Sequence, residues 1–390
     1  MVISNLRTGL SSVYHLCRSD ARTLRCGSLK YFKGHVMDPN FEYGKYLKVI
    51  NPFFAQFGFR FPNVEAEYYS LVSGIKADHY IPTTFFYNLL CPYLNKYQFR
   101  LAYQDKNMLD KYLRHEGTGG FRLADIVIKN INGIYYDGAD NHISKDVAVN
   151  MILDYPGNLI AKPAVDTTWG AGVTLVSAQD KTRKRVLEIM EKEGTNYNFQ
   201  EKIVQHPLLA SFNESSLNTV RIYTYRHIDN TIRVLGAMQR FGGKNSIVDN
   251  ASAGGGFVSL TMDGTIKDRR IKRYRAIDTG LQLTDNVTTY IPQFDKLKAV
   301  TVRLHEKLPY FNCIGWDMTV DEQDCPCVIE FNTMMASEFF QLANGPMLTS
   351  KELHELIPLV MEYQTCKHVQ SNVSFPNKSG FGIVEGQLIR

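Results

Sequence analysis

Residues 313–333 read CIGWDMTVDEQDCPCVIEFNT, two β-rich runs joined by the polar turn DEQDCP. The period-two alternation of strands predicts an apolar face made of Ile314, Trp316, Met318 and Val320 in the first run and of Ile329 and Phe331 in the second. We expect Val320 to pair with Cys327 across the turn. That register places Asp317 opposite Glu330, and Asn332 shares their face because it lies two residues further along the strand.

The polar face of this hairpin brings together three oxygen-bearing side chains. Asp317, Glu330 and Asn332 offer two carboxylates and an amide. Such hard oxygen ligands suit Mg²⁺, which commonly binds one or two carboxylates together with substrate phosphates. The pattern therefore predicts a metal site shared with a nucleotide. The alternative is a solvent-facing edge hairpin that carries acidic residues.

The composition is typical of a folded globular protein with two to three domains. Of 390 residues, 44% are apolar and 21% are charged. The formal net charge of +5 is too small a surplus over the whole chain to predict nucleic-acid binding. The sequence contains no run of about 18 apolar residues, so it predicts no membrane span. Its first residues also lack an apolar stretch of signal-peptide length.

Cysteine usage points to a reducing compartment. The seven cysteines are odd in number and widely scattered, which favours free thiols in a cytoplasmic protein. Cys325 and Cys327 form a C-P-C sequence, but no second pair or histidine cluster lies at zinc spacing. We therefore expect ordinary thiols there.

The remaining chain alternates helical and strand-like patterns. Residues 1 to about 100 are rich in Tyr and Phe, which predicts a largely helical cap whose aromatic side chains pack a core; a stacking surface for a sugar is the alternative. Asn-Gly and Asp-Gly turns in residues 121–138 predict a small antiparallel sheet. Further strands are expected at residues 158–165, 201–205, 218–227, 231–241 and 256–264, and helices at residues 178–193, 293–308 and 351–363.

Two lysines and two glycines are candidates for binding phosphate. Lys162 ends the apolar run NLIAKP, where an ammonium group requires an anionic partner. Gly170 and Gly172 follow in TTWGAGVTLV, and their backbone N–H groups could approach phosphate oxygens; a surface turn is the alternative. Lys106 lies at the start of an amphipathic helix in QDKNMLDKYL, where a solvated lysine is the alternative.

Basic residues occur in strands. Arg221 and Arg240 lie in strand-like segments with no acid nearby in the sequence, so they are candidates for bidentate binding of phosphate or carboxylate. An ion pair between strands is the alternative. The run KDRRIKRYR, residues 267–275, has six basic residues and one acid. It would suit an acidic acceptor, such as a nucleotide-sugar, or an anionic membrane surface; a solvated pair of strands is the alternative.

Taken in order, these segments resemble the ATP-grasp superfamily, and in particular the sugar-transfer-associated ATP-grasp family found with bacterial surface-polysaccharide genes. The resemblance runs from about Asp105 to Tyr363 and rests on AKP with its glycine loop, QEKIVQHP, SLNTVRIYTYR, VDNASAGGG, the IP of YIPQF, and GWDMTV followed by VIEFN. It implies an α+β fold in which two α+β subdomains clamp ATP. The implied regions are an N-terminal cap of residues 1–104, a small lid subdomain of residues 105–203, a large subdomain with the metal site of residues 204–368, and a loose tail of residues 369–390.

The resemblance also implies roles for individual residues. The ATP phosphates would be bound by Lys106 and Lys162 and covered by Gly170 and Gly172. The adenine and ribose would meet the segment Glu201, Lys202, Ile203 and Val204, with Glu201 or His206 beside the base or ribose. The triphosphate and an acyl phosphate would face the catalytic residues Arg221, Arg240 and Asn250. Two Mg²⁺ ions, for which Mn²⁺ could substitute, would be held by Asp317, Glu330 and Asn332.

The implied chemistry joins a carboxylate to an amine. The carboxylate attacks the γ-phosphorus of MgATP, and the amine opens the resulting acyl phosphate to an amide. Such a transfer depends on positioning and charge neutralisation rather than on a nucleophilic side chain. The expected substrates are an amine and a sugar or sugar-acid precursor of a surface polysaccharide, with association at the inner membrane face or with a glycosyltransferase as a further expectation. The alternatives are an ATP-dependent kinase of a sugar hydroxyl and a non-catalytic nucleotide-binding scaffold for glycosyltransferases.

Overall fold

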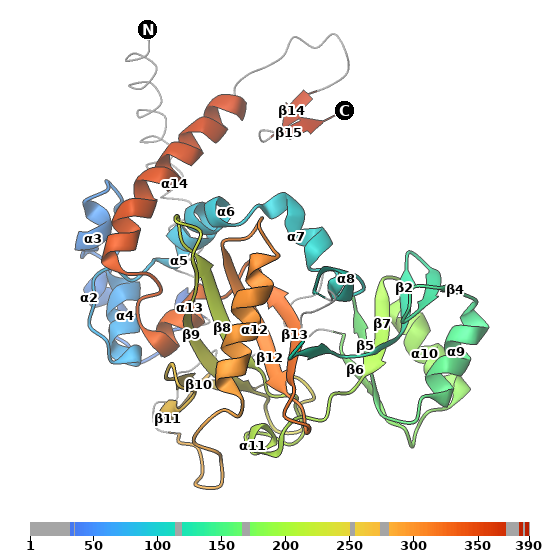
Figure 1. The fold of residues 1–390 in the computed structure, drawn as a ribbon. Coiled ribbons are helices and arrows are strands. Elements are labelled where there is room, and N and C mark those ends of the chain that lie inside the picture. The colour runs from blue at the N-terminus through green and yellow to red at the C-terminus, as the bar shows by residue number, and fades with distance from the viewer. Residues whose placement is uncertain are drawn as a thin grey trace. The chain divides into compact units, whose positions relative to one another are not determined.

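The computed structural model of the chain describes residues 32–34, 36–113, 119–165, 172–249, 254–273, 281–371, 382–384 and 387–389. These residues belong to two compact units, one of Met1–Leu94 with Ala336–Arg390 and the other of Asn95–Met335. Figure 1 labels their elements. The mixture of helices with two large sheets confirms the predicted α+β class. The predicted boundaries at residues 104, 203 and 368 stay predictions.

The first unit is mostly helical and rich in aromatic side chains, as the sequence predicts. Its elements are α2 (Tyr43–Tyr46), α3 (Pro52–Ala55), α4 (Val64–Ser73), α5 (Thr83–Phe85), the π-helix η1 (Phe86–Leu90), α6 (Cys91–Leu94), α13 (Ser337–Asn344), α14 (Ser350–Ser371), β14 (Gly382–Val384) and β15 (Gln387–Ile389). Phe54 and Phe85 are fully buried, and their ring centroids are 5.1 Å apart in an edge-to-face arrangement. Aromatic packing therefore supplies the core of this unit.

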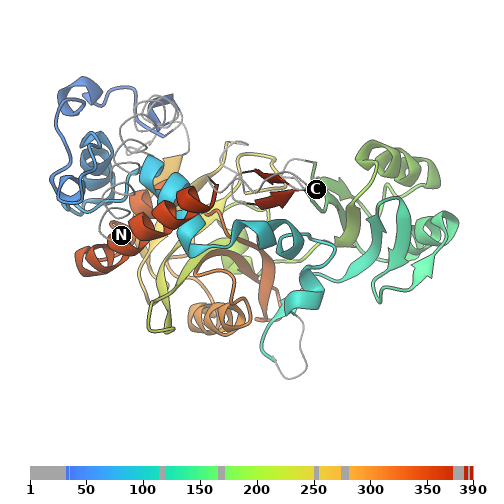
Figure 2. The same cartoon turned by 90° about the horizontal axis from the view of Figure 1, so that it is seen from above.

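A six-stranded antiparallel sheet forms one part of the second unit. Its order is β4-β3-β2-β7-β5-β6. The strands are β2 (Ile126–Ile131), β3 (Ile134–Asp137), β4 (His142–Ile143), β5 (Leu159–Pro163), β6 (Thr174–Val176) and β7 (Tyr197–Glu201), and the helices beside them are α9 (Lys145–Asp154) and α10 (Arg183–Glu193). Figures 1 and 2 show both helices beside this sheet. Alternation turns Leu159 and Ala161 toward the helices and Lys162 toward the opposite face.

Helix α10 shows how local sequence sets an element. Val186, Ile189 and Met190 are buried at helical spacing, as predicted. The helix begins at residue 183 rather than at 178 because the side chain of Thr182 accepts a hydrogen bond from a backbone N–H of the first turn. It ends before Gly194, whose φ of 72° suits glycine.

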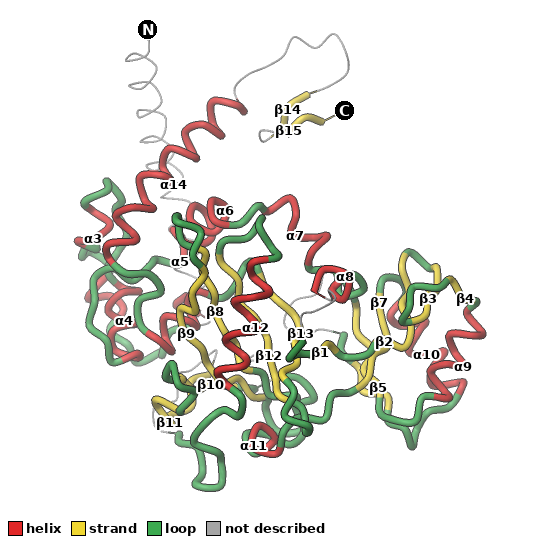
Figure 3. Tube along the Cα trace, in the orientation of Figure 1, coloured by secondary structure: helices red, strands yellow, loops and turns green. Residues whose placement is uncertain are grey.

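A seven-stranded sheet forms the other part of the second unit, in the order β1-β13-β12-β8-β9-β10-β11. The strands are β1 (Arg122–Leu123), β8 (Val220–Arg226), β9 (Ile232–Phe241), β10 (Gly256–Leu260), β11 (Ile266–Arg273), β12 (Cys313–Val320) and β13 (Pro326–Asn332), and the helices are α7 (Tyr97–Tyr103), α8 (Leu109–Leu113), α11 (Pro207–Ala210) and α12 (Phe294–Glu306). Figure 3 shows α12 crossing the strands. Leu297 and Leu304 of this helix share a buried cluster with Trp316 of β12. This apolar layer supports the strands from one side.

The β12–β13 hairpin forms as predicted, but with a different register near its turn. Val320 pairs with Pro326 rather than with Cys327, whereas Asp317 still pairs with Glu330. A register shift between residues 317 and 318 accounts for both pairings, because a bulge adds one residue to β13. The prediction for Ile329 was therefore wrong: Val328 and Phe331 enter the core, while Ile329 stays outside it, half-buried.

Other element boundaries also differ from the predictions. The strand expected at residues 201–205 covers Tyr197–Glu201 instead, because its pairing with β5 ends at Glu201. Lys106 lies before α8 rather than in a helix. The helix expected at residues 351–363 extends to Ser371. Across the described ranges, no helix combines the length and apolar character that a bilayer-crossing segment requires.

Candidate active site

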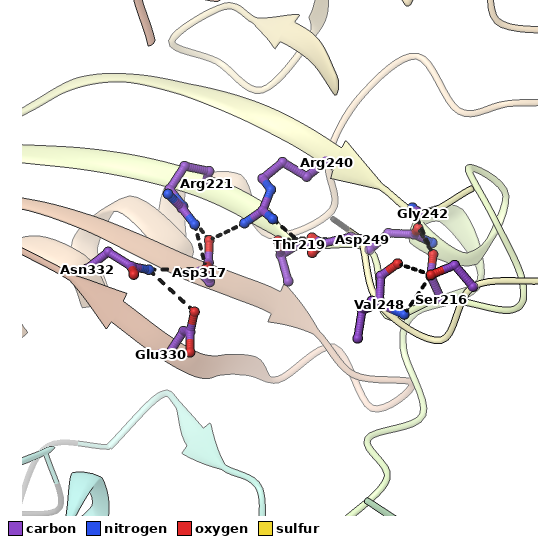
Figure 4. Close-up of polar contacts among 12 residues, drawn as sticks. Ser216, Thr219, Arg221, Arg240, Gly242, Val248, Asp249, Asp317, Glu330 and Asn332 are labelled. Carbon is purple, nitrogen blue, oxygen red and sulfur yellow. Dashed lines mark hydrogen bonds and ion pairs between the residues drawn. The ribbon is translucent and has the colours of Figure 1, made fainter. Parts of the chain in front are cut away.

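Three polar side chains lie together on β12 and β13 (Figure 4). Asp317 and Glu330 are paired across the two strands. The Nδ2 atom of Asn332 lies 3.4 Å from Oδ2 of Asp317 and 3.5 Å from Oε1 of Glu330. The predicted polar face of the hairpin is therefore present.

Two arginines from the neighbouring strands converge on Asp317. Arg221 of β8 donates from Nε and Nη2 to both carboxylate oxygens, with Nη2 2.7 Å from Oδ2. Arg240 of β9 donates from Nη1 to Oδ1 at 3.1 Å. Burial acts to raise the pKa of Asp317, but the two guanidinium groups outweigh it and hold the pKa below its ordinary value. The interstrand ion pairs left open by the sequence are therefore formed, and Asp317 is held ionised.

Arg240 has a second buried carboxylate beside it. Its Nη2 atom lies 3.1 Å from Oδ1 of Asp249, and Thr219 donates to Oδ2 of Asp249 from its backbone N–H at 3.1 Å and from its hydroxyl. Burial raises the pKa of Asp249, against the opposing charge of Arg240. Asp249 thus orients Arg240 toward the hairpin. The sequence did not single out this residue, although it directly precedes the candidate Asn250.

The two candidate lysines lie near Glu330. Lys162 on β5 is only 9% exposed, and its pKa is lowered from 10.5 to about 8, first by burial and then by Lys106, while Glu330 acts in the opposite direction. Nζ of Lys106 is 3.8 Å from Oε2 of Glu330. The fold therefore brings residues 106, 162 and 330 together from distant parts of the sequence.

A pocket beside the lysines joins the two sheets. Its lining residues include Lys106, Leu109, Leu123, Ile126, Lys162, Gln200, Val328 and Ile329. Its apolar side chains stand beside two lysines and the carboxylate of Asp110, a mixture of apolar walls and a few polar groups that is common in ligand sites. Sequence reasoning missed Gln200 and Ile329. Gln200 lies near the end of β7, a position too common to be selective, and Ile329 lies in the middle of β13, where no sequence signal marks it.

Residues 201–204 and His206, which were expected to meet adenine and ribose, follow the pocket residue Gln200. Several of them already form contacts within the chain. Glu201 pairs with Arg122 and accepts a hydrogen bond from the backbone N–H of Asp125 at 3.1 Å. Beyond β7, Lys202 donates its backbone N–H to Asn158, Ile203 is buried, and Val204 is 54% exposed. His206 caps α11, where Nδ1 accepts from the N–H of Leu208 at 3.1 Å.

Part of the predicted phosphate-binding set lies outside the described residues. The predicted residues Gly170 and Asn250 are the two that lie outside the described ranges. Gly172 is described and has a φ of 81°, and an added Cβ would lie 2.6 Å from Cγ of Pro163. Only glycine suits this position, which is in the segment predicted to cover phosphates.

Asp317, Glu330 and Asn332 are the candidate ligands for a divalent cation. Within the described ranges, no three His, Cys, Asp or Glu side chains gather closely enough to hold a metal ion. Glu330 and Asn332 fit, because a rotated amide would present its oxygen beside the carboxylate. Asp317 already accepts from two arginines, and it has lone pairs left for one further contact.

Comparison with known proteins assigns the family. The family model for sugar-transfer associated ATP-grasp matches residues 90–356, more than half of the chain. The chain belongs to the sugar-transfer associated ATP-grasp family, which confirms the resemblance seen in the sequence and the ATP-grasp fold that it implies. No curated protein matches the chain.

Several solved structures of ATP-grasp ligases are similar to the chain at low identity. The ATP-grasp ligase PsnB complexed with a minimal precursor is 14% identical with a TM-score of 0.39, over 68% of this chain and 64% of that one. D-cycloserine synthetase DcsG is 11% identical with a TM-score of 0.39, over 67% and 71%. The VanG D-Ala:D-Ser ligase from Enterococcus faecalis is 15% identical with a TM-score of 0.40, over 66% and 61%. The chain thus spans less than two thirds of the PsnB chain, and likeness at this level carries no argument about its activity.

Proposed function

We propose that this protein is an ATP-dependent ligase that joins a carboxylate to an amine through an acyl phosphate and releases ADP. The single observation that carries the proposal is the gathering of Lys106 and Lys162 opposite Glu330, beside the Asp317 cluster. Membership of an ATP-grasp family supports a nucleotide at this place.

The charge distribution suits a triphosphate. The buried ammonium group of Lys162 forms no hydrogen bond or ion pair with any residue in the described part of the chain, and burial has lowered its pKa to about 8. An anion placed beside it would restore the charged form and gain a charge-assisted contact. The ammonium group of Lys106, on the neighbouring segment, would contact the same anion.

The arginines suit the transferred phosphoryl group and the acyl phosphate. Arg221 and Arg240 are held rigidly by Asp317 and Asp249, so their donors are oriented before any substrate arrives. Preoriented donors stabilise charge that develops in the transition state without reorganisation. Glu330 and Asn332 would hold Mg²⁺, which when bound neutralises phosphate oxygens. No nucleophilic side chain is required.

The family name and the basic strand β11 favour a sugar-linked acid as the carboxylate substrate. Within that strand, Lys272 is buried and pairs with Asp268 at 3.2 Å, and Arg270 pairs with the same carboxylate at 2.9 Å. Lys267 and Arg270 are exposed, whereas Arg269 is half-buried and donates to the backbone oxygen of Thr284. A role in surface-polysaccharide synthesis, at the inner membrane face or beside a glycosyltransferase, is part of the proposal.

The test is ADP release over a panel of sugar acids and amines in the presence of Mg²⁺. We expect release to require both substrates and to be lost in Glu330→Gln. The matched control is Glu322→Gln in the exposed turn of the same hairpin, which removes the same charge and should retain activity. ADP formed equally without any carboxylate would refute the ligase.

Hydroxylamine separates this reaction from the kinase alternative. An acyl phosphate is trapped as a hydroxamate, whereas a phosphorylated sugar hydroxyl survives the treatment. ATP binding without ADP production across the whole panel would instead support the scaffold alternative.

A further inference from the structure

A row of buried polar side chains crosses the middle of the six-stranded sheet. Asn198 of β7 pairs with Lys129 of β2 on one side and with Lys162 of β5 on the other. Residues paired directly across antiparallel strands share a face, so the three side chains lie on the face opposite α9 and α10. Lys129 and Asn198 are fully buried, and Lys162 is 9% exposed.

The segment of residues 105–110 lies across this row and contacts it through Asp110 and Asn107. Asp110 accepts from Nζ of Lys129, with both carboxylate oxygens at 3.3 Å. The side chain of Asn107 accepts from Nδ2 of Asn198 at 3.1 Å and donates to the backbone oxygen of Asn130 at 3.0 Å. Lys106 is the next residue along this segment.

A further contact joins this segment to β5. The backbone N–H of Lys106 donates to the oxygen of Ala164 at 3.0 Å, two residues beyond Lys162. Asn107 is itself fully buried. The backbone that carries Lys106 is thus joined to the strands on both sides of Asn198.

The two sheet lysines of the row have different environments. Lys129 is neutralised within the chain by Asp110 and by Asp140, whose Oδ1 is 2.9 Å from Nζ. For Lys162, the acidic group that raises its pKa is Glu330 of the other sheet. Lys129 is therefore a structural cation, whereas Lys162 and Lys106 both lie beside Glu330.

We propose that the hydrogen bond between Asn107 and Asn198 acts as a positioning bridge. It fixes the backbone of Lys106 relative to Lys162, so that both ammonium groups can contact one nucleotide. This inference rests on the proposed ATP site. The bridge is needed because a lysine side chain has many rotamers, and two such cations converge on one anion only if their backbones are held relative to each other. A buried amide pair fixes that distance in a way that a solvent-exposed contact would not.

The test is a double-mutant cycle on the binding of ATP in the presence of Mg²⁺, measured by calorimetry without turnover. Asn107→Ala should weaken ATP binding about tenfold, which corresponds to about 1.4 kcal/mol. If Asn107 acts through Lys106, its substitution in a Lys106→Ala background should cause no further loss. Asn198→Ala, which removes the same bond from the other side, should give the same pattern and serves as the second variant if Asn107→Ala does not fold.

The matched control is Asn51→Ala in the first unit. Asn51 is 1% exposed and uses its amide to bond Asn63 and the backbone of Asp78, so its loss should lower stability without changing ATP affinity. Equal weakening by Asn107→Ala with and without Lys106 would overturn the bridge while leaving the ATP site intact. Absence of ATP binding by the wild-type protein would overturn both the bridge and the proposed function.

Discussion

A buried carboxyl group in the first unit leads to a strong prediction about pH. Glu65 on α4 is 4% exposed, and its Oε2 atom accepts from the backbone N–H of Thr83 at 2.6 Å and from its hydroxyl at 2.8 Å. Burial raises the pKa of Glu65 from 4.5 to about 7, with a smaller contribution from Glu338. The protonated form is therefore the one that the folded unit prefers.

The magnitude follows from that shift. One pKa unit corresponds to about 1.4 kcal/mol, so the raised pKa of Glu65 makes a stabilising contribution on the order of 3 kcal/mol that is fully present below pH 4.5. It is lost as pH rises from there through 7, because only the unfolded chain ionises freely in that range. Glu65→Gln keeps the shape and an acceptor oxygen for Thr83 but cannot ionise. The variant should therefore lose stability less than the wild type between pH 5 and pH 8.

Hydrogen exchange of the α4 amides, corrected for intrinsic rates, measures this local stability at both pH values. The control is Glu67→Gln on the same helix, where the side chain is only half-buried and the difference should be small. An equal change with pH in the wild type and Glu65→Gln would refute the argument that burial of this carboxyl group sets the pH dependence.

Three further predictions concern the second unit. Lys162→Met should raise the urea midpoint at pH 7, because burial lowers the pKa of this lysine to about 8, and should weaken ATP binding in a titration; a fall in the midpoint would contradict the first part. Lys129→Met should destabilise the protein by about 3 kcal/mol, because Asp110 would be left as an uncompensated carboxylate; an unchanged urea midpoint would show that the pair is not needed. Gly172→Ala should lower the melting temperature, because its φ is 81° and the new Cβ would lie 2.6 Å from Pro163, whereas a wild-type value would mean that the loop rearranges freely.

Local patterns were sufficient to predict several parts of the molecule. The alternation of residues 313–320 identifies the apolar face of β12, which packs in the core cluster, and helical spacing identifies the buried face of α10. The predicted pairing of Asp317 with Glu330 is confirmed, whereas the predicted pairing of Val320 with Cys327 was wrong. A bulge has no clear sequence signal in VIEFN, and it moved Ile329 from the predicted core into the lining of the pocket.

The environments of the charged residues depended on contacts far apart in the chain. Arg122 pairs with both Glu201 and Asp321, so a residue expected at the adenine is already bound to an arginine. No local pattern predicts such a pair, because its members are separated by 79 and 199 residues.

The amino-acid sequence alone determined the class of fold, the family, and which residue types stand on the polar face of the hairpin, because these depend on short periodic patterns and on motif order. Only the tertiary structure decided that Asp317 is held by two arginines, that Lys106 and Lys162 approach Glu330, and that Asn107 joins Asn198. Those arrangements depend on how two sheets and a connecting segment pack. The burial that lowers the pKa of Lys162 exists only once that packing has excluded water.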